Sequence, residues 1–197
     1  MPGDAIVAKR QPTPLHPKGL QQAVCVDVID LGENVEQFQK QDPRVVHKIA
    51  FVFETKHTNP MTGRPWELSR EMPLSLGKKA TLRKWIGDWR GSRVTQDEAD
   101  EGIVLSDYVG KNALLSVEHA VSEASERTYA KITNIAPLMD GMELVEPSDE
   151  YKRSEWWGDK QGEYAAAVAK FKRQRGEGPE RPIAEVLGEN DDDGLLF

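Results

Sequence analysis

The residues most suggestive of catalysis are Glu54 and Lys56, which follow a hydrophobic segment and have Asp30 and Asp42 upstream. In metal-dependent nucleases, two carboxylates hold Mg²⁺ while a lysine polarises the attacking water. This spacing is common by chance, and the sequence predicts no helix before its first strand, although the nuclease fold requires one. A nuclease that uses Glu54 and Lys56 is therefore kept as an alternative, tested by Mg²⁺-dependent DNA cleavage that Glu54→Ala abolishes.

Other catalytic and ligand-binding patterns are weaker. Cys25 is the single cysteine, so no internal disulfide can form, and its place in an expected strand predicts a small buried residue. Gly110 and Lys111 lack the glycine spacing of a phosphate-binding loop. The four histidines are scattered and, with one cysteine, form no structural zinc pattern. We therefore expect no catalytic residue, metal or cofactor.

The charge of the chain is concentrated at its C-terminal end. Of the net charge of −7 carried by 197 residues, −6 belongs to residues 177–197. The remainder is almost neutral, so the acidic composition does not exclude an anionic ligand. The densest basic stretch is residues 76–93, in which six lysines and arginines accompany one carboxylate, Asp88.

Hydrophobic patterning predicts five strands and a central helix. The strands are expected at residues 24–31, 45–55, 64–74, 113–121 and 127–138. Between the third and fourth strands, residues 76–89 predict an amphipathic helix. Its apolar stripe is Leu82, Trp85, Ile86 and Trp89. Thr95 and Glu98 then predict the capping box of a short second helix.

This order of elements predicts a mainly β fold, the five-stranded oligonucleotide-binding (OB) barrel with its helix between strands three and four. Ile49, Phe51 and Phe53 share one strand face and are expected in its core. Other small-barrel folds are also compatible with the sequence, because the order of the strands in a sheet cannot be determined from one sequence. The predicted organisation is a flexible arm at 1–19, the barrel at 20–148, an extension at 149–176 with a helix from 163 to 175, and an acidic tail at 177–197.

The tail ends in an acidic run followed by an apolar tip. An exposed hydrophobic end gains free energy by docking in a partner's pocket, and a basic rim around that pocket would attract the acidic residues. The same residues can also compete with nucleic acid for a cationic groove of the protein itself. The residues predicted to recruit partners are Asp191, Asp192, Asp193, Leu195, Leu196 and Phe197.

This tail resembles the C-terminal signature of bacterial and phage single-stranded DNA-binding proteins, and residues 20–137 resemble the phage-encoded group. The matching segments are Phe51-Val52-Phe53-Glu54, Trp85 to Gly91, Val109-Gly110-Lys111 and Tyr129-Ala130-Lys131-Ile132. The chain departs from many bacterial members because it lacks a long Gly/Gln/Pro linker. The resemblance implies a non-catalytic, largely sequence-independent single-stranded DNA-binding protein. It would act in phage or bacterial DNA replication and recombination, with replication or recombination proteins as partners of its tail.

Binding single strands without base readout requires cations for phosphates and aromatic rings on which bases stack. In an OB fold this surface lies on the second and third strands and the flanking loops. The resemblance therefore implies DNA contacts by Lys48, Lys56, Arg64, Trp66, Arg70, Arg127, Tyr129 and Lys131. The basic stretch adds Lys78, Lys79, Arg83 and Lys84, which extend the phosphate track, form a solvated face or cradle the tail.

Several aromatic residues have a structural alternative. Trp66 is equally compatible with capping the barrel, Tyr129 with packing in its strand, and Trp156 and Trp157 with packing, stacking or a subunit contact. A second functional alternative is an OB-like adaptor that binds protein through its tail. Oligomeric state and RNA discrimination stay open.

The sequence also predicts where the protein works. No apolar run approaches the roughly 20 residues of a membrane span, and residues 1–20 lack the apolar core of a secretion signal. A single cysteine is typical of a reducing compartment. We expect a cytoplasmic protein without membrane association, in the host cell if the gene is carried by a phage.

Overall fold

The computed structural model describes residues 14–37, 41–122 and 125–177. The five strands are β1 (Gly19–Glu36), β2 (Arg44–Thr58), β3 (Pro65–Pro73), β4 (Asn112–Val121) and β5 (Thr128–Ala136). The helices are α1 (Thr81–Arg90), α2 (Gln96–Glu101), the 3-10 helix η1 (Leu105–Tyr108) and α3 (Trp156–Gln174). The residues predicted to recruit partners, 191–193 and 195–197, lie outside the described part of the chain.

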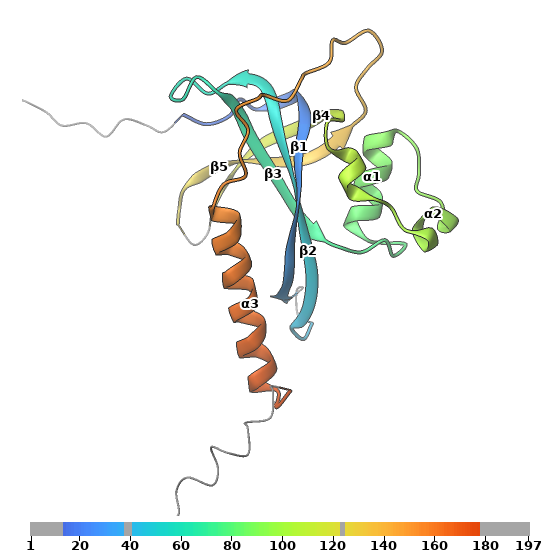
Figure 1. The fold of residues 1–197 in the computed structure, drawn as a ribbon, viewed down its shortest axis with the longest axis vertical. Helices are drawn as coiled ribbons and strands as arrows, with labels where there is room; N and C mark the ends of the chain where they lie inside the picture. Colours follow the sequence, from blue (N-terminus) through green and yellow to red (C-terminus); the bar gives the residue numbers. More distant parts are fainter. Residues whose placement is uncertain (1–13, 38–40, 123–124, 178–197) are drawn as a thin grey trace, which may run out of the picture.

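The strands form one antiparallel sheet in the order β3-β2-β1-β4-β5 (Figure 1). β1 pairs with β4 through its first residues and with β2 along most of its length. Register shifts after Cys25 and after Asp30 let this long strand bend. The predicted mainly β class and the helix between the third and fourth strands are confirmed, but β3 and β5 form no ladder, so the sheet is not closed into a barrel.

The main core lies between one face of the sheet and α1. The rings of Phe51 and Phe53 lie 5.8 and 5.3 Å from that of Trp89, and all three side chains are buried. Trp89 also donates its indole N–H to the carbonyl of Asn112, 2.9 Å away. The predicted apolar stripe of α1 is buried at all four positions, so the expected core is confirmed. Cys25 is buried in this core too, and burial raises the pKa of its thiol to about 12.

Helix α1 begins later than the sequence predicts. It starts at Thr81, and Ala80 provides no side-chain cap. Residues 76–80 form a turn because Arg83 binds the carbonyl of Leu76 and Ala80 N–H bonds to Gly77. Lys78 and Lys79 therefore lie in the loop before α1 and not on the predicted helix.

Other elements are longer than predicted, among them β1, β2 and α3. β1 continues to Glu36, beyond the predicted end at residue 31, because its polar end pairs with the start of β2. α3 begins at Trp156, seven residues before the expected position 163. Its first turns contain two glycines, so packing on the sheet outweighs the low helix propensity of glycine.

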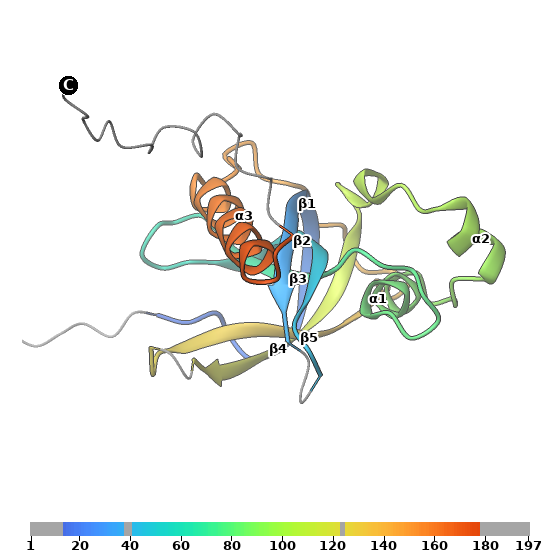
Figure 2. The ribbon, with the colours of Figure 1, turned by 90° about the horizontal axis from the view of Figure 1, so that it is seen from below.

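α3 covers the second face of the β1–β2 part of the sheet, opposite α1 and α2 (Figure 2). Trp157 is buried there in a second hydrophobic cluster with Val24, Val26 and Val52. The central strands are therefore buried on both faces. None of the described helices is long and apolar enough to cross a membrane.

Candidate nucleic-acid interface

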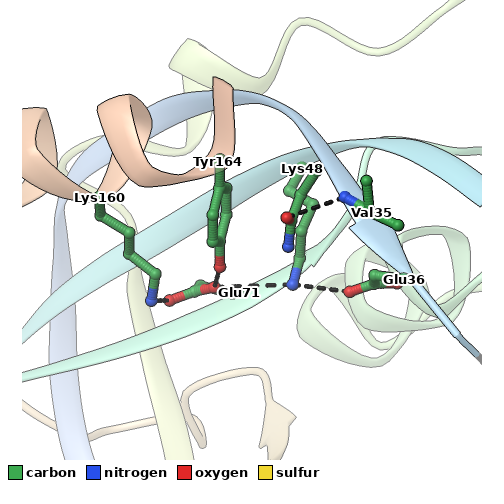
Figure 3. Close-up of polar contacts among 7 residues, drawn as sticks. Val35, Glu36, Lys48, Glu71, Lys160 and Tyr164 are labelled. Atoms are coloured by element: carbon green, nitrogen blue, oxygen red, sulfur yellow. Dashed lines mark hydrogen bonds and ion pairs between the residues drawn. The ribbon is translucent and has the colours of Figure 1, made fainter. Parts of the chain in front are cut away.

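Side chains of α3 reach the face of β2 and β3 on which the sequence predicted DNA contacts. Glu71 of β3 accepts a hydrogen bond from the Tyr164 hydroxyl at 2.8 Å and one from the Lys160 ammonium (Figure 3). Lys48 of β2 lies 3.7 Å from Glu71 and 2.7 Å from Glu36. Burial alone would raise the pKa of Glu71, but these hydrogen bonds and the charges of Lys160 and Lys48 hold it below its usual value.

The same face carries further carboxylates. Glu54 is 2% exposed and accepts hydrogen bonds from the backbone N–H and hydroxyl of Ser148, at 2.7 and 2.6 Å. Glu67 pairs with Glu54 across the strands, and both burial and the charge of Glu54 raise the pKa of Glu67. With its apolar cluster and its carboxylates, the face under α3 would repel a phosphate backbone. Lys48 belongs to this internal network, and its side chain is 13% exposed.

The same geometry bears on the nuclease alternative. The carboxylate of Glu54 is already bound by Ser148, while Lys56 is exposed. Asp30 of β1, upstream of Glu54, has its carboxylate 2.6 Å from the His47 ring in the neighbouring strand β2. Across the described ranges, no three His, Cys, Asp or Glu side chains are grouped so that they could hold a metal ion. Glu54 thus has a structural role in fastening the C-terminal extension.

Two hairpins meet at the other end of the sheet, and His16 connects them. Its Nδ1–H donates to the Pro17 carbonyl at 2.7 Å, so the neutral ring accepts from the Thr55 hydroxyl at Nε2, 2.9 Å away. The His16 ring lies 5.8 Å from the Trp66 ring in β3. The backbone carbonyl of His16 accepts a hydrogen bond from His119 Nε2 in β4 at 2.8 Å. The end of the predicted flexible arm is therefore packed, since His16 is 1% exposed.

The two-hairpin surface combines six of the predicted DNA-binding residues. They are Lys56, Arg64 and Trp66 on the β2–β3 hairpin and Arg127, Tyr129 and Lys131 on the β4–β5 hairpin. The β2–β3 and β4–β5 hairpins project on the same side of the molecule (Figures 1 and 2). Tyr129 is 44% exposed, and Lys56, Arg127 and Lys131 are exposed as well. This surface therefore combines exposed cations with an exposed aromatic ring.

Two members of this surface are partly engaged within the chain. Trp66 is half-buried against His16, which agrees with the alternative that it caps this end of the sheet. Arg64 lies 3.0 Å from Glu150, but both side chains are more than 60% exposed, so this ion pair contributes little. In the β4–β5 ladder, Glu118 lies directly opposite Lys131 and is the acidic residue paired with that lysine.

The chain matches no model of a known protein family and no curated protein. The interface is therefore interpreted from its own geometry.

Arg70 lies away from the two-hairpin surface. Its guanidinium donates to the Ile132 carbonyl of β5 and lies 5.0 Å from the centre of the Trp85 ring. Burial lowers the pKa of Arg70. Its position between the two edge strands indicates a structural role, in which it fastens β3 to β5 where their backbones do not pair.

The basic stretch divides into engaged and exposed cations. Arg83 donates to the carbonyls of Val94 and Leu76, at 3.0 and 3.3 Å, and Lys84 pairs with Asp88. Lys78 and Lys79 are exposed in the loop before α1. Of the four basic residues of the prediction, Arg83 therefore holds local structure, Lys84 forms a surface ion pair within α1, and Lys78 and Lys79 face solvent.

Sequence reasoning missed the contacts that fasten the C-terminal extension. Asp27 accepts from Arg153 at 2.6 and 2.7 Å and from the Tyr151 hydroxyl at 2.9 Å. The adjacent Trp156 and Trp157 were the available signal. They begin a helix, so they do not point in opposite directions as in an extended segment, and Trp157 is buried while Trp156 is 51% exposed.

The buried His16 predicts that acid destabilises the protein. Burial lowers its pKa, and the nearby His57 and His119 lower it further. The unfolded chain, in which His16 has a pKa near 6.5, therefore binds a proton more readily than the folded protein. The contribution of neutral His16 to the free energy of unfolding should be fully present above about pH 6.5 and should fall as the pH drops below that value. Urea unfolding at several pH values tests this, and a His16→Gln variant should lose part of the pH dependence. An unchanged pH dependence in that variant would contradict the assignment.

Proposed function

We propose that this protein binds single-stranded DNA without catalysis and largely without regard to sequence. The observation that carries this proposal is the two-hairpin surface, where exposed Arg127, Tyr129 and Lys131 lie at the same end of the sheet as Lys56. Cations that neutralise phosphates, together with a ring on which a base stacks, are what such binding requires. A role in phage or bacterial DNA replication and recombination follows from the resemblance of the sequence.

We assign the fold to an OB barrel that is open between β3 and β5. The strand order β3-β2-β1-β4-β5 and the helix between β3 and β4 support this assignment. Arg70 spans the opening by donating to Ile132, which keeps the two edges close. In this arrangement the hairpin turns flank the end of the barrel, at which the two-hairpin surface lies.

The DNA path proposed here differs from the general OB expectation. α3 packs on β1, its Trp157 lies against Val52 of β2 and its Tyr164 reaches Glu71 of β3, while Glu54 and Glu67 add carboxylates to the same face. Placing phosphates there would require displacing Trp157 and would bring like charges together. The strand is therefore proposed to cross the hairpins, with phosphates near the cations and a base against Tyr129.

The salt dependence of binding tests this proposal. The three exposed cations of this surface that form no ion pair within the described residues (Lys56, Arg127 and Lys131) predict a slope of about −2 for log affinity against log salt, from about −0.7 for each phosphate contact. Affinity for a short oligo(dT) should then fall about 20-fold between about 50 and 200 mM salt. Fluorescence anisotropy of labelled oligo(dT) measures it, with duplex DNA of the same length as the control.

The same assay separates the alternatives. Absence of binding to oligo(dT) at low salt would favour the protein-binding adaptor, and Mg²⁺-dependent cleavage lost in Glu54→Ala would favour the nuclease.

We propose that residues 191–197 recruit replication or recombination proteins. A variant without them should bind DNA at least as tightly as the full chain, because an acidic competitor is removed. Loss of DNA binding in that variant would contradict the role of the tail.

A further inference from the structure

A basic groove lies beside α1, apart from the two-hairpin surface. It encloses about 840 Å³ between α1, the loop that follows it and the end of β5. Lys78, Lys84 and Arg93 line it on the helical side, and Asn134 and Ile135 of β5 line it on the sheet side. We call this the α1 groove.

Two of its cations are available to a ligand. Lys84 is paired with Asp88, which removes the single carboxylate of the groove from the charge balance. Lys78 and Arg93 are exposed, and within the described ranges neither takes part in an ion pair or a side-chain hydrogen bond. The α1 groove therefore carries two uncompensated positive charges facing solvent.

Close packing holds the walls of the α1 groove in place. A Cβ atom at Gly87 would lie 3.2 Å from the carbonyl oxygen of Ser92, so glycine lets the following loop approach α1 closely. Gly91 ends the helix with φ of 68°, and a Cβ atom there would lie 3.3 Å from Pro137 Cγ, just after β5. Arg83 fastens the same loop by donating twice to Val94. The backbone that bears Arg93 is thus positioned before any ligand binds.

β5 connects the α1 groove with the two-hairpin surface. Tyr129 and Lys131 are exposed in its first half, and exposed Asn134 in its second half lines the groove. At about 3.3 Å per residue, the nine residues of β5 span about 30 Å. Nucleotides stacked about 3.4 Å apart would cover this distance with at most about nine units. Such a length lies within the range of about 4 to 16 nucleotides that one OB fold binds.

We propose that a single strand longer than the two-hairpin surface continues along β5 into the α1 groove, where Lys78 and Arg93 bind its phosphates. This inference rests on the proposed function and adds a second segment to the binding path. The ligand proposed for the α1 groove is a polynucleotide, because a small anion would make no contact with the exposed β5 residues Tyr129, Lys131 and Asn134. The consequence is that the α1 groove contributes to affinity only when the strand is long enough to reach it.

Oligonucleotides of two lengths test this inference. The variant Lys78→Ala/Arg93→Ala should bind an oligo(dT) of about 20 nucleotides about tenfold or more weakly than the unmodified protein, and its salt slope should be shallower by about 1.4 because two phosphate contacts are lost. Binding of an oligo(dT) of about five nucleotides should be unchanged. Both side chains are exposed, so the urea midpoint of the variant should match that of the unmodified protein.

A matched control is Lys152→Ala/Lys170→Ala, which removes two exposed lysines from the C-terminal extension and should leave both affinities unchanged. An equal loss for the two lengths would overturn the inference, because the α1 groove would then be the primary site. No loss for either length would overturn it as well. If the unmodified protein bound neither oligonucleotide, the proposed function itself would fail, and that outcome is visible before any variant is compared.

Discussion

Replacing Tyr129 with alanine should weaken binding of a short oligo(dT) by about 5- to 150-fold. This range corresponds to the roughly 1–3 kcal/mol that stacking of one base on an aromatic side chain contributes. Tyr129 is 44% exposed on the outer side of an edge strand, so it can offer its ring to a base without unfolding the hairpin. Adding Arg127→Ala and Lys131→Ala should lower the affinity further and make the salt slope shallower by about 1.4.

The conservative variant Tyr129→Phe is the control for this prediction. It retains the ring and removes only the hydroxyl, so its affinity should stay close to that of the unmodified protein. Because the side chain is exposed, neither variant should change the urea midpoint by more than a small amount. If Tyr129→Ala bound as tightly as the unmodified protein while Trp66→Ala did not, the stacking residue would be Trp66 and the assignment to Tyr129 would be wrong.

A large loss of stability is expected from Trp157→Ala. Trp157 is 6% exposed and packs in the cluster formed by Val24, Val26 and Val52. Removing a buried tryptophan side chain leaves a cavity and costs about 3–5 kcal/mol. Urea unfolding followed by circular dichroism measures this loss without relying on tryptophan fluorescence.

Its neighbour supplies a matched control. Trp156 has the same chemistry but is 51% exposed, so Trp156→Ala should cost well under 1 kcal/mol. Equal effects of the two substitutions would contradict the packing described for the start of α3.

Trp157→Ala also tests whether the covered face of the sheet is a hidden DNA site. Loosening α3 would uncover the valines of the cluster together with Glu54 and Glu71, which do not attract phosphates. The affinity of the folded variant for oligo(dT) should therefore not rise. A marked increase would show that α3 competes with DNA for the β2–β3 face, and it would move the binding site away from the hairpins.

The candidate site shows which placements followed from local sequence and which did not. Arg127, Tyr129 and Lys131 were predicted on the closing hairpin, and all three are exposed on it. Lys48 and Arg70 have the same residue types and comparable strand positions, yet both are engaged inside the molecule. The difference lies in their partners, since Arg70 binds Ile132, 62 positions away, and Lys48 approaches Glu71 beside α3. No local sequence pattern indicates such a distant partner.

His16 illustrates the same limit in the N-terminal arm. Its prolines and charges predicted an extended, flexible segment, and the residue itself carries no periodic signal. It is buried because Thr55, Trp66 and His119, which come from three different strands, surround it.

The sequence by itself determined the features that depend on neighbouring residues. The alternation of the strands, the buried stripe of α1 and the capping box of Thr95 and Glu98 follow from spacing within one element, so the order of strands and helix was predictable. Only the tertiary structure decided which cations face solvent and which face of the sheet is free. Those outcomes depend on α3 docking onto β1 and β2 and on contacts such as Arg153 with Asp27, 126 positions apart. Such contacts form when the whole chain buries its apolar surface, and that balance of free energy is not encoded in any single segment.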